Sequence, residues 1–152
     1  MSTISMDQVK ALREKTGISV MQCQKALAEA NGDEAKALEI LRQKGSEAAL
    51  KKADRTLGAG VVSSYIHSNG AVGAMVQLAS ETDFVSNNAE FKALAYDIAM
   101  QVSATSPPSK EELMASGFIK NPDVTVAQLV ESAIQKFGEK IEIGQFVRIS
   151  AT

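Results

Sequence analysis

The residues best suited to covalent or proton-transfer chemistry, His67 and Cys23, occur once each in this 152-residue chain. Nucleophilic catalysis requires a base within hydrogen-bonding reach of the nucleophile. Cys23 falls in a predicted helix near the N-terminus, whereas His67 stands beside a predicted hairpin turn in a second domain. We therefore expect His67 to be solvated or lightly hydrogen-bonded, and we predict no Cys–His catalytic pair.

Patterns for phosphate, metal and acid–base chemistry are also incomplete. The glycine-rich runs Gly58-Ala59-Gly60 and Gly70-Ala71-Val72-Gly73 do not continue into a phosphate-binding loop or a dinucleotide-binding turn. One Cys and one His cannot supply the nitrogen and sulfur ligands of a typical zinc site. Glu81 and Asp83 are close in sequence, but no second carboxylate pair completes an enclosed acid–base site. We predict that the protein is not an enzyme and uses no cofactor or metal.

The charge balance indicates the class of partner. The chain has 16 Lys and Arg against 18 Asp and Glu, and neither Lys nor Arg occurs from Leu57 to Phe91. Nucleic-acid binding usually needs a basic face, so we expect no direct contact with nucleic acid. No apolar run approaches the roughly 18 residues of a membrane span, and the N-terminus lacks a secretion signal. We expect a cytoplasmic protein without membrane contact, and the single cysteine agrees with a reducing compartment.

The segment Thr82-Asp83-Phe84-Val85 is the candidate interaction site. It follows a predicted strand, precedes a predicted helix cap, and places an aromatic side chain beside a carboxylate. Phe84 can be interpreted as part of the local core, with Asp83 as a turn or cap residue. The alternative interpretation is an exposed apolar anchor of the kind that dominates protein interfaces. Composition does not decide between the two interpretations.

Three short helices are predicted in the first third of the chain, over Met6–Lys15, Val20–Ala30 and Glu34–Lys44. The spacing of Ser5 and Gln8 forms a capping box for the first helix, and Ser19 and Gln22 repeat it for the second. Together the helices are expected to close a small bundle.

A connector helix is predicted over Glu47–Arg55, because Gly45-Ser46 can end the third helix and cap a fourth. The connector is rich in Ala and charged residues and poor in large apolar ones, so it should bury little surface. We therefore divide the chain into a helical domain (1–45), a connector (46–57) and a second domain (58–152).

The second domain is predicted to be α+β, with a three-stranded antiparallel sheet packed by helices. Two apolar, β-branched runs flank Asn69-Gly70, which favours a type I′ hairpin turn. A returning strand near the C-terminus completes the sheet, because a hairpin alone is marginally stable. The predicted strands are Ala59–Ser68, Ala71–Ala79 and Lys140–Ile149. The predicted helices run from an Asn87 cap to Ser103, over Lys110–Ser116, and over Val126–Phe137 after a Thr125–Gln128 capping box.

Four separated blocks, in order, resemble the elongation factor Ts family. The first two are Leu12-Arg13-Glu14-Lys15-Thr16-Gly17 and Met21-Gln22-Cys23-Gln24-Lys25-Ala26-Leu27, the latter followed by Ala30-Asn31-Gly32-Asp33. The other two are Ser64-Tyr65-Ile66-His67-Ser68-Asn69-Gly70 and Glu81-Thr82-Asp83-Phe84-Val85. The resemblance implies a ubiquitin-associated-like three-helix domain followed by an α+β core. It also implies a guanine nucleotide exchange factor that promotes GDP release from elongation factor Tu during translation elongation.

The resemblance also implies roles for particular residues. Thr82 to Val85 would protrude, with Phe84 wedging into the GTPase domain of elongation factor Tu and Asp83 as its polar companion. The wedge would disturb the magnesium site and the phosphate-binding loop of the partner. Further positions that match family contacts are Leu12, Val20 and Met21 in the helical domain, the turn Phe137-Gly138, and His67.

The length of the chain bears on its assembly. Longer family members have two core subdomains, whereas this sequence predicts one, and short members compensate by forming homodimers. We therefore expect a homodimer that presents two cores, an expectation that the open edges of a three-stranded sheet support. The alternative function is a ubiquitin-associated-like module that binds peptides or acts as a scaffold without exchange activity.

Overall fold

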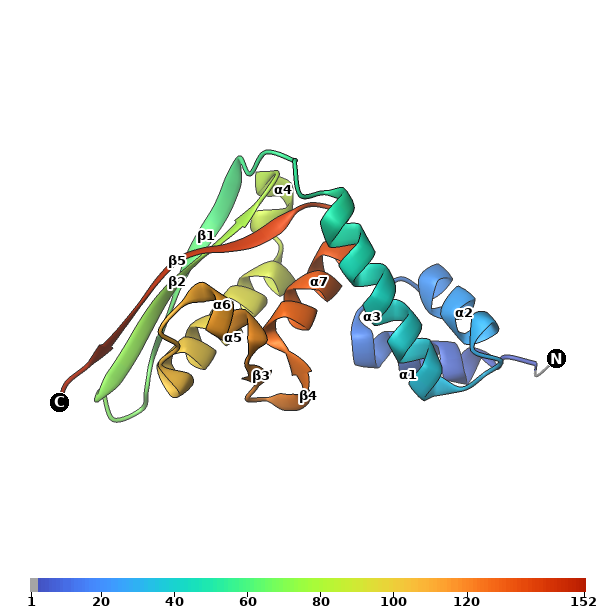
Figure 1. Ribbon diagram of the computed structural model, residues 1–152, viewed down its shortest axis with the longest axis horizontal. Helices are drawn as coiled ribbons and strands as arrows, with labels where there is room; N and C mark the ends of the chain where they lie inside the picture. Colours follow the sequence, from blue (N-terminus) through green and yellow to red (C-terminus); the bar gives the residue numbers. More distant parts are fainter. Residues whose placement is uncertain (1–2) are drawn as a thin grey trace.

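The computed structural model describes residues 3–152 and contains a helical end and an α+β end (Figure 1). Along the chain the helices are α1 (Met6–Thr16), α2 (Val20–Glu29), α3 (Glu34–Lys51), α4 (Asp83–Ser86), α5 (Ala89–Thr105), α6 (Lys110–Ala115) and α7 (Val126–Phe137). The strands are β1 (Ala59–Ile66), β2 (Val72–Ser80), β3 (Gly117–Phe118), β4 (Asn121–Thr125) and β5 (Ile141–Ser150). The predicted α+β class is confirmed. Within residues 3–152, every helix is too short or too polar to span a bilayer.

Side-chain oxygens cap the starts of the three N-terminal helices, and the predicted Ser5–Gln8 capping box is confirmed. The Ser5 hydroxyl accepts the Gln8 N–H at 3.2 Å, and the Gln8 side chain accepts the Ser5 N–H at 3.0 Å. Ser19 and Asp33 cap α2 and α3 through their side-chain oxygens. The predicted Ser19–Gln22 capping box is wrong in its second half, because Oε1 of Gln22 is buried without a hydrogen-bond partner among the described residues. The helices enclose a cluster of buried residues that consists of Val9, Leu12, Ile18, Cys23, Ala26, Leu27, Ala30, Ala37 and Leu41.

The predicted break at Gly45 is wrong, because α3 continues through it to Lys51. Gly45 is buried, and a Cβ atom there would lie 3.3 Å from Oε1 of Gln135 and 3.5 Å from the carbonyl oxygen of Glu131 on α7. The glycine therefore lets two helices approach closely instead of ending one. The predicted connector becomes the last turns of α3, where Ala48 and Ala49 pack against the second core.

The three-stranded sheet has the order β1-β2-β5 and is antiparallel throughout. The β1–β2 connection differs from the predicted type I′ turn, which needs positive φ at both central residues. Gly70 has φ of 72°, but among the described non-glycine residues positive φ occurs at Asn31 and Ser106 and not at Asn69. Instead, the His67 carbonyl accepts the Gly70 N–H at 2.7 Å, and His67 N–H reaches Val72 O at 2.9 Å.

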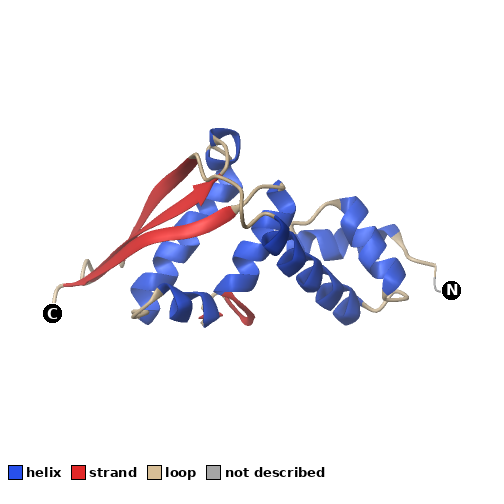
Figure 2. Ribbon diagram, turned by 45° about the horizontal axis from the view of Figure 1, so that its top comes forward, coloured by secondary structure: helices blue, strands red, loops and turns tan. Residues whose placement is uncertain are grey.

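Helices cover one face of the sheet, as Figure 2 shows. Helix α5 packs against β1 and β2, and its N-cap is Asn88 instead of the predicted Asn87. Helix α7 begins with the predicted Thr125–Gln128 capping box and also contacts α3, so it joins the helical end to the α+β end. The buried cluster here is centred on Val76, Leu78, Phe91, Ile98, Val102, Val126, Ile134 and Ile143.

A short hairpin of β3 and β4 follows α6 and was not predicted. The buried side chain of Gln101 on α5 holds it in place. Its Nε2 donates to the Gly117 carbonyl at 2.9 Å, and its Oε1 accepts the Ile119 N–H at 2.9 Å. The hairpin is thus held by a polar residue that lies 16 and 18 positions before its partners in the chain.

Candidate functional site

Phe84 is the most exposed large apolar residue of the described chain, with 90% of its surface accessible. It lies on α4, a single helical turn at the end of β2 and at one end of the sheet (Figure 1). The interpretation of Phe84 as part of the local core is therefore wrong. An exposed aromatic side chain on a protruding turn has the properties of an interface anchor.

The neighbours of Phe84 hold α4 against the sheet. Val85 is 5% exposed and belongs to the core cluster of the sheet, so its side chain attaches the turn to the core. The buried Ser80 hydroxyl donates to the Thr82 carbonyl at 2.9 Å, and the Ser86 hydroxyl donates to the Asp83 carbonyl at 3.3 Å. Because Val85 points inward on a one-turn helix, Phe84 is directed toward solvent. Asp83 is exposed beside it.

Two carboxylates, Glu139 and Glu81, also fix this segment through partners far away in the sequence, and neither role was predicted. Glu139 accepts both the N–H and the hydroxyl of Thr82, at 3.1 and 2.6 Å. Glu81 accepts the Lys140 N–H at 2.8 Å and pairs with Arg55 at 3.3 Å. The Lys140 N–H and then Arg55 hold the pKa of Glu81 below its ordinary value. No local pattern reveals these partners, which lie 57 and 59 residues apart in the chain.

The turn Phe137-Gly138 comes directly after α7 and lies next to the α4 segment through Glu139. Gly138 ends the helix with φ of 72°, a conformation that glycine adopts without strain. Phe137 is half-buried and meets Phe91 edge to face, with ring centroids 6.3 Å apart. The structure thus brings Phe137 and Gly138 close to Thr82, although Phe137 serves mainly as a packing residue.

The helical end presents a second apolar surface. Val20 and Met21, at the start of α2, are 40% and 65% exposed and are available for contact. Leu12 is 0% exposed and lies in the core of the three helices, so its predicted place among the direct contacts is corrected. Its role is to support the helices that carry the surface residues.

His67 lies far from the other candidates. The register pairs Ala59 with Ser80 at the α4 end of the sheet and Ile66 with Gly73 at the other end. The seven residue steps of β1 from Ala59 to Ile66 span about 23 Å. His67 is exposed, and its Nδ1 lies 3.1 Å from the Tyr65 hydroxyl. The structure therefore does not bring His67 together with Phe84.

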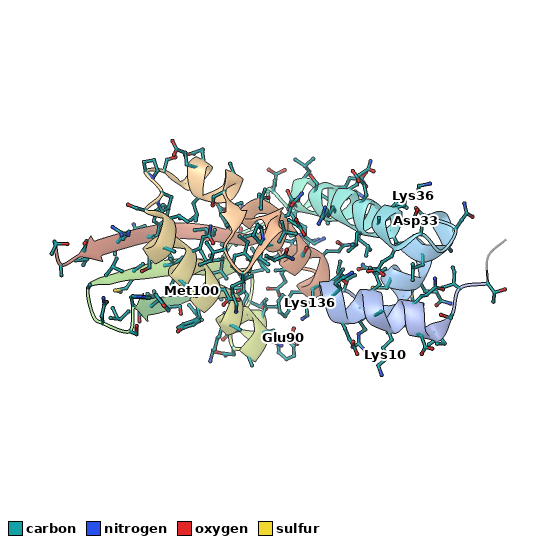
Figure 3. The ribbon with its side chains drawn as sticks, turned by 90° about the horizontal axis from the view of Figure 1, so that it is seen from below. Lys10, Asp33, Lys36, Glu90, Met100 and Lys136 are labelled. Carbon is teal, nitrogen blue, oxygen red and sulfur yellow. The ribbon has the colours of Figure 1, made fainter. Side chains whose placement is uncertain are left out.

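Lys136 connects the helical end to the segment that follows α4. Its side chain lies under the α1–α2 turn, 3.2 Å from where a Cβ atom of Gly17 would stand, and it pairs with Glu90 at the start of α5. Figure 3 shows Lys136 and Glu90 side by side between the two ends of the molecule. Burial, and then the nearby Arg13, lower the pKa of Lys136.

The described residues offer two exposed apolar surfaces, at Phe84 and at Val20 and Met21. Among residues 3–152, no group of three or more His, Cys, Asp and Glu side chains could hold a metal ion. Cys23 is buried and its Sγ donates to the Ile18 carbonyl at 3.6 Å, in the helical cluster remote from His67. What the arrangement can do is present an aromatic anchor and a second apolar patch to a partner.

Comparison with known proteins gives matches over nearly the whole chain. Elongation factor Ts of Desulforamulus reducens is 40% identical, over 97% of this chain and 89% of the relative. The corresponding protein of Carboxydothermus hydrogenoformans is 42% identical, over 95% of this chain and 88% of the relative. The chain belongs to the elongation factor Ts family. In addition, the family model "Elongation factor TS" matches residues 81–152.

Membership in the elongation factor Ts family agrees with the resemblance read from the sequence. The family-model match begins at Glu81, so it includes Thr82 to Val85 and the turn Phe137-Gly138. The helical end, with Val20 and Met21, is covered by the near-full-length relatives. This family comprises translation elongation factors that act by nucleotide exchange and not as enzymes, which confirms that part of the prediction.

Proposed function

We propose that this protein binds GDP-bound elongation factor Tu and promotes GDP release, with Phe84 inserted into the GTPase domain. The observation that carries the proposal is the position of Phe84, 90% exposed on a turn anchored by Val85 and by hydrogen bonds. A rigid turn can present an aromatic ring with little loss of conformational freedom on binding. Thr82 and Asp83 border the ring and supply polar contacts.

The mechanism is coupling between two binding events. A factor that binds the nucleotide-free GTPase more tightly than the GDP-bound form must, by reciprocity, lower the affinity for GDP. Burial of a phenylalanine side chain contributes about 1.5–3 kcal/mol, and that energy is available only in a partner state open enough to admit the ring. Displacement of the partner's magnesium site and phosphate-binding loop would follow from that insertion.

Val20 and Met21 form the second contact in this proposal. Their exposed side chains suit an apolar surface on the same GTPase domain, while Leu12 supports them from the core. This contact adds affinity for both nucleotide states and therefore little to the difference between them. We place the protein's action in the cytoplasm, where translation takes place, without direct binding of nucleic acid.

A second copy of the chain completes the proposed functional unit. The sheet face opposite α5 carries exposed apolar side chains, namely Val62, Ile66, Met75, Val147 and Ile149. Among the described residues that line the shallow hollows of this face, Glu142 is the one charged residue. A two-fold contact places a surface against itself, so a face with little charge brings little repulsion between copies. We propose that the homodimer forms through this face.

The test of the exchange function is release of a fluorescent GDP analogue from elongation factor Tu. We expect the rate to rise with the concentration of this protein and then to level off. Phe84→Ala should lower the limiting rate by about tenfold or more while the melting temperature stays unchanged, because the ring is exposed.

Leu50→Ala is the matched control, since it also removes an exposed apolar side chain but lies at the end of α3. It should leave the rate unchanged. Absence of any acceleration by the wild-type protein at saturating binding would contradict the exchange function. A loss of folding in Phe84→Ala would instead return Phe84 to a packing role.

A further inference from the structure

The last turn of α7 contacts both ends of the molecule. Gln135 lies against Gly45 of α3, and Lys136 contacts the Gly17 turn and pairs with Glu90. Phe137 packs on Phe91. Packing against α3, α5 and the turn after α1 therefore fixes the position of the chain where it leaves α7.

Glu139 follows the C-cap of α7, and its side chain reaches the segment that carries Phe84. Its Oε1 accepts the Thr82 N–H at 3.1 Å, and its Oε2 accepts the Thr82 hydroxyl at 2.6 Å. Thr82 is the N-cap residue of α4, and its own side chain makes no capping bond to that helix. The carboxylate of Glu139, between α7 and β5, thus holds the N-cap residue of α4.

We propose that Glu139 is a positioning residue for nucleotide exchange, which acts by fixing α4 so that Phe84 points at the partner. This inference rests on the proposed exchange function and extends it to a residue that need not touch the partner. The two hydrogen bonds from Thr82 to Glu139 add to the Ser80–Thr82 bond and the packing of Val85, and they fix the direction of the turn from the side of α7. Small displacements of a positioned group have large effects on rate.

Two substitutions of Glu139 separate the effect of its hydrogen bonds from the effect of its negative charge. In Glu139→Gln, one oxygen remains to accept the Thr82 N–H, and the amide nitrogen can donate to the Thr82 hydroxyl oxygen. Glu139→Ala loses both interactions. If position is what matters, Gln should retain most of the exchange rate and Ala should lose it by about tenfold.

The deciding experiment is a double-mutant cycle on the limiting rate of GDP-analogue release. The four proteins are wild type, Glu139→Ala, Phe84→Ala and the double variant, each with its melting temperature measured. We expect Glu139→Ala to slow release in the wild-type background and to have no further effect when Phe84 is already alanine. Asp97→Ala is the matched control, since it removes a surface ion pair between Asp97 on α5 and Lys120 and should change nothing.

The outcomes separate this inference from the exchange function itself. If Glu139→Ala slows release by the same factor in both backgrounds, Glu139 acts independently of Phe84 and the inference is overturned. An unchanged rate for Glu139→Ala, or a Glu139→Gln variant as slow as Glu139→Ala, would also overturn it. The wild-type rate and the Phe84→Ala variant alone test the exchange function, whatever Glu139 does.

Discussion

Leu12 and Met21 show at the residue scale how the same apolar class serves two purposes. The family resemblance assigns both to one surface, but Leu12 is fully buried and Met21 is largely exposed. Their substitutions should therefore affect different quantities.

Leu12→Ala should lower the free energy of unfolding by about 2–5 kcal/mol, because it leaves a cavity in the helical core. Met21→Ala should change it by less than about 0.5 kcal/mol and weaken association with elongation factor Tu. Urea unfolding and titration with the GTPase measure the two effects. A strongly destabilised Met21→Ala, or one that binds as tightly as wild type, would remove Met21 from the proposed surface.

Glu81 gives a prediction of pH dependence. The Lys140 N–H, and then Arg55, lower the pKa of Glu81 below its ordinary value of 4.5. A group with a lowered folded-state pKa stabilises the folded protein above its unfolded pKa, and this contribution is lost as pH falls through the folded pKa. Glu81→Gln should therefore melt below wild type at neutral pH, and the difference should shrink as the pH falls below 4.5. Melting curves with a constant difference across that range would contradict the role of the Glu81 charge.

The sequence indicates which segment forms the candidate site, but it does not predict the exposure of its side chains or their hydrogen-bond partners. The segment Thr82 to Val85 stands out in the sequence, yet composition allowed Phe84 to be either core or anchor, and its exposure decides the matter. Glu81 and Glu139 act through partners 57 to 59 residues away, which no local pattern encodes. His67 matched a family position but lies at the opposite end of the sheet.

At the scale of elements, capped helices were the most predictable features. The Ser5–Gln8 and Thr125–Gln128 capping boxes form as expected, because their chemistry involves residues only three positions apart. The helix end predicted at Gly45 is wrong because the sequence does not distinguish a glycine that ends a helix from a glycine at a close helix crossing. The β3–β4 hairpin was not predicted because Gln101, the residue whose side chain bonds to its backbone, lies outside the hairpin on α5.

The crossing at Gly45 can be tested by substitution. Gly45→Leu should destabilise the protein by about 1–3 kcal/mol, because the side chain would force α3 away from α7. Gly45→Ala should stay within about 1 kcal/mol of wild type, since its Cβ would meet the flexible Gln135 amide at 3.3 Å and gain helix propensity. Urea unfolding compares the two variants. Equal stability of Gly45→Leu and Gly45→Ala would show that the crossing is not tightly packed.

At the scale of the whole molecule, the uncovered face of the sheet predicts the assembly. Light scattering at micromolar concentration should give twice the 16.1 kDa mass of one chain. Met75→Lys should give the single-chain mass, because it places a charge in the middle of the apolar face. A wild-type protein that remains at 16.1 kDa would contradict the homodimer.

The two proposed contacts with elongation factor Tu belong to one body. Helix α7 packs on α3 at one end, and the turn that follows it binds Thr82, so Met21 and Phe84 are connected through a few packed residues. A factor of this kind can hold the partner with the helical end while Phe84 supplies the difference in affinity between the two nucleotide states. Bond chemistry has no part in this account, which agrees with a chain that has one His and one Cys.

The most direct test compares affinities of wild type and Phe84→Ala for nucleotide-free and GDP-bound elongation factor Tu. The ratio of the two affinities is the factor by which this protein weakens GDP binding. We predict that Phe84→Ala lowers affinity for the nucleotide-free form by about 10- to 150-fold, and affinity for the GDP-bound form far less. Equal losses in both forms, or no loss in either, would contradict the claim that Phe84 drives exchange.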